Sequence, residues 1–431
     1  MVVTWILVLS LGLAVQGQKL PHLVGSFAAD TPGFTNLYEH RFPKNPKEKY
    51  SLIFSSFLPV PFVSDQILAV KHIGKFLGNV GAIKPGVLAD DLTWPREPSQ
   101  IPYEVFEKEA VCSPYGFLVP GKNDGSIEII DVSGDKGKQY DIVRQPGVSA
   151  KDWFFHTVVW KDVNGDGRID IITARARQEL FTGITETEVL WLEHPTGNPF
   201  TQPWKQRSIA KDVAGVFIRE AQLTSNFRTY NTIITPGYFT QKLSIFWTEN
   251  IQERWDSPAD VNHRTIDEGL GKYFDAQVVD MNNDGKPDVL FTINAAENGS
   301  IWILETPDDF KTGTFIRHKL ADGFDSRSGL MGGGNPGSMK AFYPNERDTS
   351  KKPYIMMSGD DGGTAYILTP KSERKDDWEY ELHTMLDEGE GVIIGKLSAA
   401  DVDGDGYTEI FASSYTNEKV HVYSYGPARK G

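Results

Sequence analysis

The stretch DVNGDGRIDI, residues 162–171, carries side-chain oxygens at positions one, three, five and nine of a glycine-containing loop. The pattern returns as DMNNDGKPDVL at 280–290 and as DVDGDGYTEIF at 401–411. Each copy fits D-x-[DN]-x-D-G-x-x-[DE] followed by an apolar residue. Three copies in one chain indicate an internal repeat, so the fold has to be sought in the unit that repeats.

The repeated unit reads as four short strands. Each loop is followed by an apolar segment (IDIITARA, DVLFTINA, EIFASSY), then by segments such as VLWLEHP and SIWILETP, and then by segments such as VNHRTI and IRHKLA. Gly, Asp, Asn and Pro separate these runs, as is typical of turns between strands. No amphipathic helix of convincing length interrupts them, so an all-β fold is predicted.

Degenerate copies fill the gaps between the acidic loops. EAQLTSNFRT aligns with DAQVVDMNND, and KAFYPNERD aligns in the same way, which gives anchor positions 162, 225, 280, 345 and 401, spaced by 55 to 65 residues. Four-stranded units of this length indicate propeller blades. The sequence therefore predicts a single-domain, seven-bladed β-propeller over residues 18–431, with six or eight blades as alternatives. The early segment HLVGSF is expected to complete the last blade and close the ring.

The acidic loops are predicted to bind calcium. Oxygen ligands in this number suit Ca²⁺, and the glycine permits the tight turn that brings them together. The alternative for each loop is an acidic turn without metal. A structural role is expected, because each site ties one strand of a blade to the next. The predicted ligands are Asp162, Asn164, Asp166, Asp170, Asp280, Asn282, Asp284, Asp288, Asp401, Asp403, Asp405 and Glu409.

Composition and the first residues suggest where the protein works. The apolar run in residues 2–15, followed by a small-x-small pattern, predicts a secretory signal over residues 1–17, and hence a secreted or secretory-pathway protein. The net charge of −14 argues against a nucleic-acid partner. The one cysteine, Cys112, is expected to be a buried, inert thiol. Asn298 heads a glycosylation sequon in a turn-like segment. The chain has no other apolar run of that length, so no membrane span is predicted. Whether the protein forms a homodimer is left open.

Chemistry is expected at a mouth of the central channel. Aligned positions at the start of each inner strand are predicted to form a ring of mixed charge, the alternative being charges that pair with one another: Thr157, Glu220, Asp275, Lys340 and Lys396. DWFFHT, residues 152–157, suggests aromatic stacking on a ligand, with blade-to-blade packing as the alternative: Trp153, Phe154 and Phe155. His156 is the first candidate for acid–base chemistry, with Lys340 and Lys396 beside it. Arg175 is a weaker candidate for binding an anion.

Two further segments belong to this picture. SLIFSSFLPVPF at 51–62 and LTWPREPSQIP at 92–102 are rich in Phe and Pro and lack acidic loops. They are predicted to line an apolar pocket on one side of the channel. The glycine-rich segment at 329–340 is predicted to be an inter-blade loop, with a lid as the alternative. No P-loop, G-x-S-x-G or dinucleotide-binding motif is present, so no organic cofactor is expected.

From about residue 110 onward the acidic loops resemble FG-GAP/VCBS repeats, the blade type of integrin α-subunit propellers. The whole chain is similar to a group of secreted fungal propellers, on the basis of its first residues, the 51–62 and 92–102 segments, DWFFHT and the acidic blades. That group includes the hetero-Diels-Alderases of tropolonic sesquiterpenoid pathways and the propeller of aldos-2-ulose dehydratase. The dehydratase carries additional C-terminal domains, so the likeness favours the cycloaddition enzymes.

The resemblance implies a cofactor-independent hetero-Diels-Alderase that joins a tropolone quinone methide to a terpene olefin such as humulene. Two alternatives stay open. One is a sugar lyase or dehydratase with His156 as the base, for which a pocket with several convergent histidines and a metal would be expected. The other is a non-catalytic glycan- or protein-binding propeller, for which a flat mouth without a pocket would be expected.

Overall fold

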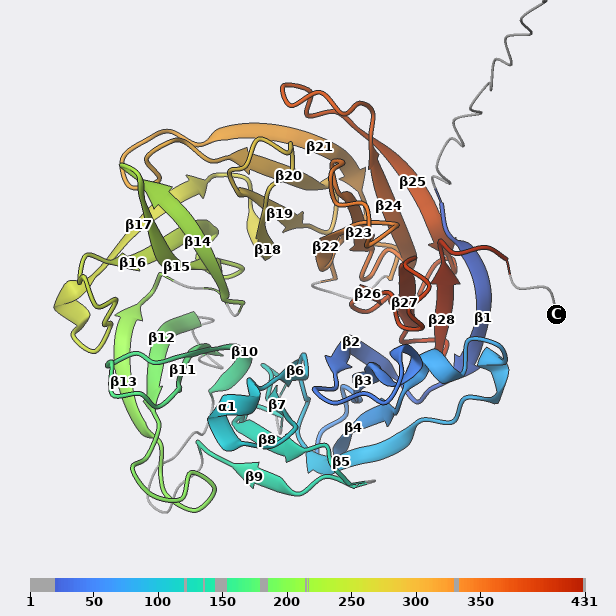
Figure 1. Ribbon diagram of the computed structural model, residues 1–431, viewed down its shortest axis with the longest axis horizontal. Helices are drawn as coiled ribbons and strands as arrows, with labels where there is room; N and C mark the ends of the chain where they lie inside the picture. The colour runs from blue at the N-terminus through green and yellow to red at the C-terminus, as the bar shows by residue number, and fades with distance from the viewer. Residues whose placement is uncertain are drawn as a thin grey trace, which may run out of the picture.

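Seven four-stranded antiparallel sheets are arranged around a central axis in a computed structural model of the chain (Figure 1). The structure describes residues 20–119, 122–134, 136–143, 153–178, 185–213, 215, 217–328 and 333–428. The predicted all-β, seven-bladed propeller is therefore confirmed. The predicted signal segment, residues 1–17, and residues 329–332 of the glycine-rich segment lie outside the described residues.

Each blade runs from an inner strand at the channel to an outer strand at the rim. Blade 1 contains β2 (Pro32–Glu39), β3 (Tyr50–Ser56), β4 (Asp65–Val70) and β5 (Gly86–Leu92). Blade 2 contains β6 (Ser99–Gln100), β7 (Ala110–Pro114), β8 (Ile127–Asp131) and β9 (Gln139–Asp141). Blade 3 contains β10 (Phe154–Lys161), β11 (Asp170–Gln178), β12 (Thr185–Glu193) and β13 (Lys205–Lys211). Blade 4 contains β14 (Arg219–Ser225), β15 (Arg228–Pro236), β16 (Lys242–Thr248) and β17 (Val261–Glu268).

Blades 5 to 7 follow the same order. Blade 5 contains β18 (Lys272–Val279), β19 (Asp288–Asn294), β20 (Gly299–Glu305) and β21 (Ile316–Phe324). Blade 6 contains β22 (Met339–Phe342), β23 (Tyr354–Ser358), β24 (Thr364–Pro370) and β25 (Tyr380–Asp387). Blade 7 contains β26 (Ser398–Ala400), β27 (Glu409–Ser414), β28 (Lys419–Ser424) and β1 (His22–Ala28). The helices are short: α1 (Tyr103–Phe106) and the 3-10 turns Pro46–Glu48, Ile73–Lys75, Val80–Ala82 and Pro258–Asp260.

The ring is closed by strands from the two ends of the chain. The early strand β1 pairs antiparallel with β28, from His22 opposite Ser424 to Ala28 opposite Lys419. A side-chain hydrogen bond between Ser26 and His421, 2.9 Å long, crosses the same pair. The closure predicted from HLVGSF is confirmed. The early strand covers the outer edge of β28 and gives blade 7 the same four strands as the other blades.

The core lies between the blades. The two apolar residues that follow an acidic loop face opposite neighbours, because side chains alternate along a strand. In β11, Ile171 packs in the cluster between blades 2 and 3, whereas Ile172 packs in the cluster between blades 3 and 4. In β27, Ile410 and Phe411 face blades 6 and 1 in the same way. The apolar doublets of the repeat are thus strands that are buried on both faces.

The acidic loops lie on one face of the ring. They connect the first and second strands of blades 3, 5 and 7, in alternation with the degenerate blades 4 and 6. The connections between second and third strands lie on the opposite face, because neighbouring strands are antiparallel. No helix in the described part of the chain has the length and apolarity needed to cross a membrane.

Candidate functional site

A cavity of about 510 Å³ lies at the channel mouth opposite the acidic loops. Its walls come from the starts of inner strands, from connections between second and third strands, and from the segment between β5 and β6. All seven blades contribute. The described lining includes Phe34, Phe57, Pro59, Trp94, Arg96, Phe117, Phe154, His156, Phe217, Tyr238, Phe239, Phe274, Asn294, Ser338, Ser358, Asp360, Asp361, Ile394, Lys396 and Tyr415. The cavity is of the size that holds a small organic ligand.

The apolar wall is a continuous series of aromatic rings. Trp94 lies 4.8 Å from Phe57 and 4.9 Å from Phe117 between ring centroids. The series runs on through Phe154, Phe239, Tyr238, Phe274, Phe217, His156 and Phe34, and returns to Phe57. Rings that pack on one another hold each other's orientation, so the wall is formed before a ligand arrives. The 51–62 and 92–102 segments supply part of it, as the sequence predicts.

His156 lies within this wall. Its ring is 3% exposed, with its centroid 3.9 Å from that of Phe217 and 5.5 Å from that of Phe34. Nδ1 is buried and has no hydrogen-bond partner among the described residues. Burial, with the positive charge of Arg96 and two further cations, holds the pKa of His156 well below its ordinary value. The ring is therefore neutral at physiological pH and can accept or donate one hydrogen bond toward a ligand.

Two polar residues that sequence reasoning did not single out also line the cavity. Arg96 is 5% exposed, and burial lowers the pKa of its guanidinium to about 9. Asp360 adopts a left-handed backbone conformation (φ 46°) in the connection between β23 and β24. Burial, together with the nearby Asp361, raises the pKa of the Asp360 carboxyl well above its ordinary value, although Arg96 opposes the shift. Left-handed conformation at a non-glycine residue is enriched at ligand sites.

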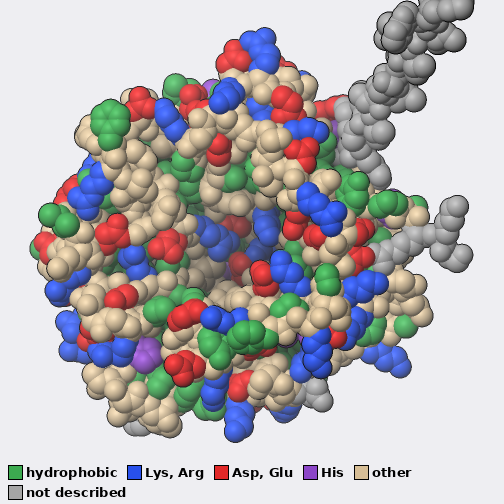
Figure 2. Space-filling model, viewed as in Figure 1, with side chains coloured by type: hydrophobic (Ala, Val, Ile, Leu, Met, Phe, Trp, Pro, Cys, Tyr) green, Lys and Arg blue, Asp and Glu red, His purple; other side chains and the backbone are tan. Residues whose placement is uncertain are grey.

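Four charged residues pair across the channel beside the cavity. Lys396 forms an ion pair with Glu97, whose second oxygen is 3.5 Å from the Arg219 guanidinium. Arg219 is in turn 2.9 Å from Oδ1 of Asp275. Burial alone would raise the pKa of Glu97, but Lys396 and Arg219 outweigh it and lower the pKa to about 2. Lys396 is thus paired with Glu97, and Asp275 is paired with Arg219. This matches the alternative given for the ring of mixed charge, in which the charges pair with one another. Basic and acidic side chains are visible inside the central hollow (Figure 2).

Lys340 lies near this cluster without joining it. Its ammonium is 3.3 Å from the carbonyl oxygen of Ala399, and this end of the side chain is largely removed from water although the residue as a whole is exposed. Loss of water around the ammonium lowers the pKa of Lys340, and the positive charge of Lys396 lowers it further. Thr157 is buried, and its hydroxyl accepts a hydrogen bond of 2.8 Å from the backbone N–H of Ile218.

The structure corrects the expected position of Glu220. Arg219, one residue earlier, takes the place in the cluster, and Glu220 lies 3.8 Å from Lys161 instead. The reason is strand register. Pairing in β18 is irregular between Tyr273 and Ala276, and β10 has the same irregularity, whereas β14 pairs with β15 without a break. Such an irregularity shifts the alternation of side chains by one residue, so positions that align in sequence point differently.

The structure also divides the aromatic residues of DWFFHT. Phe154 lines the cavity, but Phe155 is fully buried in the cluster between blades 2 and 3 and cannot touch a ligand there. Trp153 packs instead over Arg175 and Arg177, with their guanidinium carbons 4.2 and 4.7 Å from its ring. Arg175 is bonded to Glu188 at 2.6 and 2.9 Å. Neither Trp153 nor Arg175 is among the described cavity residues.

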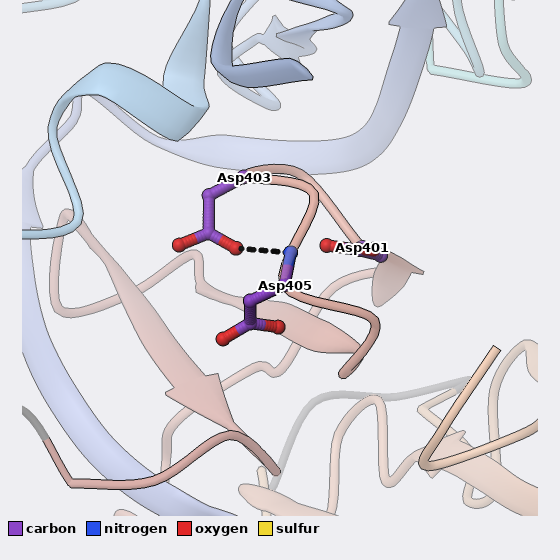
Figure 3. A group of neighbouring side chains, drawn as sticks. All are labelled: Asp401, Asp403 and Asp405. Carbon is purple, nitrogen blue, oxygen red and sulfur yellow. Dashed lines mark hydrogen bonds between the residues drawn. The ribbon is translucent and has the colours of Figure 1, made fainter. Parts of the chain in front are cut away.

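The acidic loops bring together the side chains of their first, third and fifth positions. Asp401, Asp403 and Asp405 offer carboxylate oxygens that all lie within 4.8 Å of one another (Figure 3). Backbone N–H groups hold the loop: Gly404 and Gly406 each donate to Asp401 at 2.8 Å. Three converging carboxylates fit a hard divalent cation, whereas in the first loop the Arg168 guanidinium forms an ion pair with Asp166.

The ninth position of each loop is used differently. Glu409 accepts hydrogen bonds from the N–H of Val402 at 3.1 Å and from the Ser424 hydroxyl at 2.8 Å. Asp170 and Asp288 accept equivalent bonds from the loop and from the residue after the third strand. This carboxylate therefore fastens the loop to the sheet, and the loop carboxylates lie close enough to add to the rise in its pKa that burial causes. Its predicted part in binding calcium stays a prediction.

Two isolated predictions concern single residues. Cys112 is fully buried, and burial raises the pKa of its thiol to about 12, in keeping with an inert side chain. Asn298 is exposed in the connection between β19 and β20, with φ of 57°, on the same face as the cavity.

Comparisons with known proteins concern the fold. The Dos1 propeller is 9% identical, with 91% of this chain and 78% of that chain covered and a TM-score of 0.43. Drosophila Plexin A in complex with Semaphorin 1b is 8% identical, with 95% and 88% covered and a TM-score of 0.44. No family model matches the chain, and no curated protein does. The likeness to FG-GAP/VCBS repeats and to cycloaddition enzymes stays a prediction.

Proposed function

We propose that the protein is a cofactor-independent hetero-Diels-Alderase that joins a tropolone quinone methide to a terpene olefin such as humulene. The observation that carries the proposal is the cavity of about 510 Å³, whose accessible surface is mostly apolar and aromatic, with charged groups at Arg96, Asp360, Asp361 and Lys396. Such a cavity suits two apolar, conjugated partners better than a sugar, which needs many hydrogen bonds. A flat mouth, expected of a protein-binding propeller, is not what this face presents.

The proposed reaction needs little acid–base catalysis. The [4+2] addition forms one C–C and one C–O bond and converts three π bonds into one, and no atom leaves. Holding both partners face to face in the aromatic cavity makes the bimolecular step effectively intramolecular. A hydrogen bond or positive charge at the heterodiene oxygen, from residues such as His156 or Lys396, lowers the barrier further. An apolar wall also keeps water from the quinone methide.

The test is a comparison of the cycloaddition with and without the purified protein. The quinone methide is generated in buffer from a stable precursor, humulene is added, and the rate and the ratio of diastereomers are measured. The proposal predicts a faster reaction and a shift to one diastereomer. An unchanged rate and an unchanged ratio would refute it.

One observation favours a second candidate, a sugar lyase or dehydratase. His156 is buried and neutral, its Nδ1 has no partner among the described residues, and it faces a ligand cavity, so it could act as a base. It is the one histidine among the described lining residues, whereas this candidate calls for several. Replacement His156→Ala separates the two functions. A lyase loses nearly all turnover, whereas a catalyst that works by positioning retains a substantial part.

We also propose that the three acidic loops bind structural Ca²⁺ through the side chains at positions one, three and five. The converging carboxylates of Asp401, Asp403 and Asp405 support this, and Asn164 and Asn282 are the corresponding third-position ligands in the other loops. A bound ion would neutralise the repulsion within each loop and fix the connection between two strands. Secretion, proposed from residues 1–17, would supply the calcium.

A further inference from the structure

Arg96 is a buried cation that lacks a counter-ion. Its residue is 5% exposed, and the guanidinium carbon lies 4.1 Å from the ring centroid of Phe117 and 5.7 to 5.8 Å from those of Phe34, Trp94 and Phe154. No carboxylate of a described residue forms an ion pair with it. Among the described residues its guanidinium donates one long hydrogen bond, 3.4 Å, from Nε to the carbonyl of Gly116. One terminal nitrogen is buried and unpaired among the described residues.

A cation held in this way is costly for the empty protein. Moving a charge out of water is unfavourable unless an opposite charge or good hydrogen bonds replace the solvent. Stacking on aromatic rings offsets part of the cost, and it uses the face of the guanidinium only. The edge of the guanidinium, where its N–H groups form a planar fork, stays available. That fork matches two neighbouring oxygens that share a negative charge.

Asp360 is the carboxyl whose charge acts on Arg96, and no ion pair joins the two. Burial, with the nearby Asp361, raises the pKa of the Asp360 carboxyl well above its ordinary value, which weakens it as a counter-ion. The positive charge facing the cavity is therefore left for a ligand.

We propose that Arg96 is the anchor of an anion subsite in the cavity, which binds the paired oxygens of a flat, conjugated acid while the ring of that acid packs against the aromatic wall. The ligand chemistry is a delocalised anion with two adjacent or geminal oxygens, as in an ionised tropolone or an aromatic carboxylate. The inference deepens the proposed function, on which its choice of tropolone rests, because it names the part of the substrate that the cavity recognises.

The experiment compares two ring-matched probes. Tropolone carries an acidic hydroxyl beside its carbonyl, whereas tropone has the same seven-membered ring without that hydroxyl. Binding of each to the full chain is measured by calorimetry near pH 8, where tropolone is ionised, and sodium benzoate is measured in parallel. The variants are Arg96→Met, Arg96→Lys and, as a control, Arg374→Met, which removes an exposed arginine paired with Asp376 on the outside of the ring.

The wild type and Arg374→Met are expected to bind tropolone at least tenfold more tightly than tropone. Arg96→Met is expected to lose that difference, and Arg96→Lys to keep a part of it, because an ammonium cannot pair with both oxygens at once. Arg96→Met is also expected to unfold at the same temperature as the wild type or a higher one, because an uncompensated buried charge is removed. Benzoate that binds in an Arg96-dependent way supports the subsite with a carboxylate as its source.

Equal affinity for tropolone and tropone in the wild type, with no Arg96-dependent binding of benzoate, overturns the inference. So does a preference for tropolone that survives in Arg96→Met. Failure of the proposed function gives a different result: Arg96-dependent binding of tropolone with no acceleration of the cycloaddition leaves the subsite standing and removes the enzyme. Conversely, a cycloaddition whose rate Arg96→Met leaves unchanged keeps the enzyme and removes the subsite.

Discussion

The two faces of the propeller differ in the residues that form them. On one face, the connections between first and second strands carry acidic loops that gather carboxylates and hold them with backbone N–H groups. On the other face, the starts of inner strands and the opposite connections form an aromatic cavity with buried polar groups that lack partners. The cavity gathers several such atoms around one space, namely Nε1 of Trp94, a terminal nitrogen of Arg96 and Nδ1 of His156, whereas Nε of Arg168 is the described one within the acidic loops. Unsatisfied buried groups are tolerated where a ligand completes them, so the difference indicates which face carries function.

The largest expected effect concerns the charge cluster that lies between the faces. Glu97→Gln keeps the shape of the side chain but leaves Lys396 and Arg219 without their shared counter-ion in a buried setting. Breaking a buried pair in this way costs about 3–5 kcal/mol of unfolding free energy, measured by denaturant titration. The matched control is Glu104→Gln, which removes an exposed pair with Arg41 and should change little. Equal stability of both variants would mean that the cluster does not hold the channel together.

The next largest expected effect is stabilisation by calcium bound at the acidic loops. Calcium should raise the unfolding free energy by about 2.7 kcal/mol per site when its free concentration is a hundred times the dissociation constant, and a chelator should remove the gain. Asp405→Asn should reduce the gain by weakening one site. Asp348→Asn, an acid in the degenerate loop of blade 6, should leave the gain intact. If calcium does not change the melting temperature, the loops are acidic turns without metal.

Much of this division is readable from the sequence, and the limits have physical causes. The acidic loops give the blade period, and the apolar doublets after them give strands that are buried on both faces, so the fold follows. Arg96 and Glu97 escape notice because they lie in a connection of the early blades, where no acidic loop supplies an anchor for alignment. The sequence alignment predicts Glu220 where the structure has Arg219, because the register irregularity of β18 is missing from β14. Strand register decides which of two neighbouring residues, here Arg219 or Glu220, points into the channel.

A smaller effect tests the cavity face by pH. Burial holds the pKa of His156 well below its value in an unfolded chain, about 6.5. Below that pH the unfolded chain binds a proton that the folded chain does not, so stability falls as the pH falls. The loss is at most about 1.4 kcal/mol at pH 5.5, the limit for a ring that stays neutral in the folded chain. His156→Gln should lack this part of the acid sensitivity, whereas His263→Gln, at an exposed site, should follow the wild type. A His156→Gln profile parallel to that of the wild type would contradict burial in the neutral form.

The most direct test of the account uses one substitution on each face of the same blade. Phe239 lies on the cavity wall in the connection between β15 and β16, and Phe227 is fully exposed at the turn between β14 and β15 on the acidic face. The rate and the diastereomer ratio of the quinone methide–humulene reaction are measured for Phe239→Ala and Phe227→Ala. The account predicts a rate about tenfold lower, or about 1.4 kcal/mol in barrier, and a loosened ratio for Phe239→Ala, with wild-type values for Phe227→Ala. Wild-type values for both variants, or an equal loss in both, would contradict it.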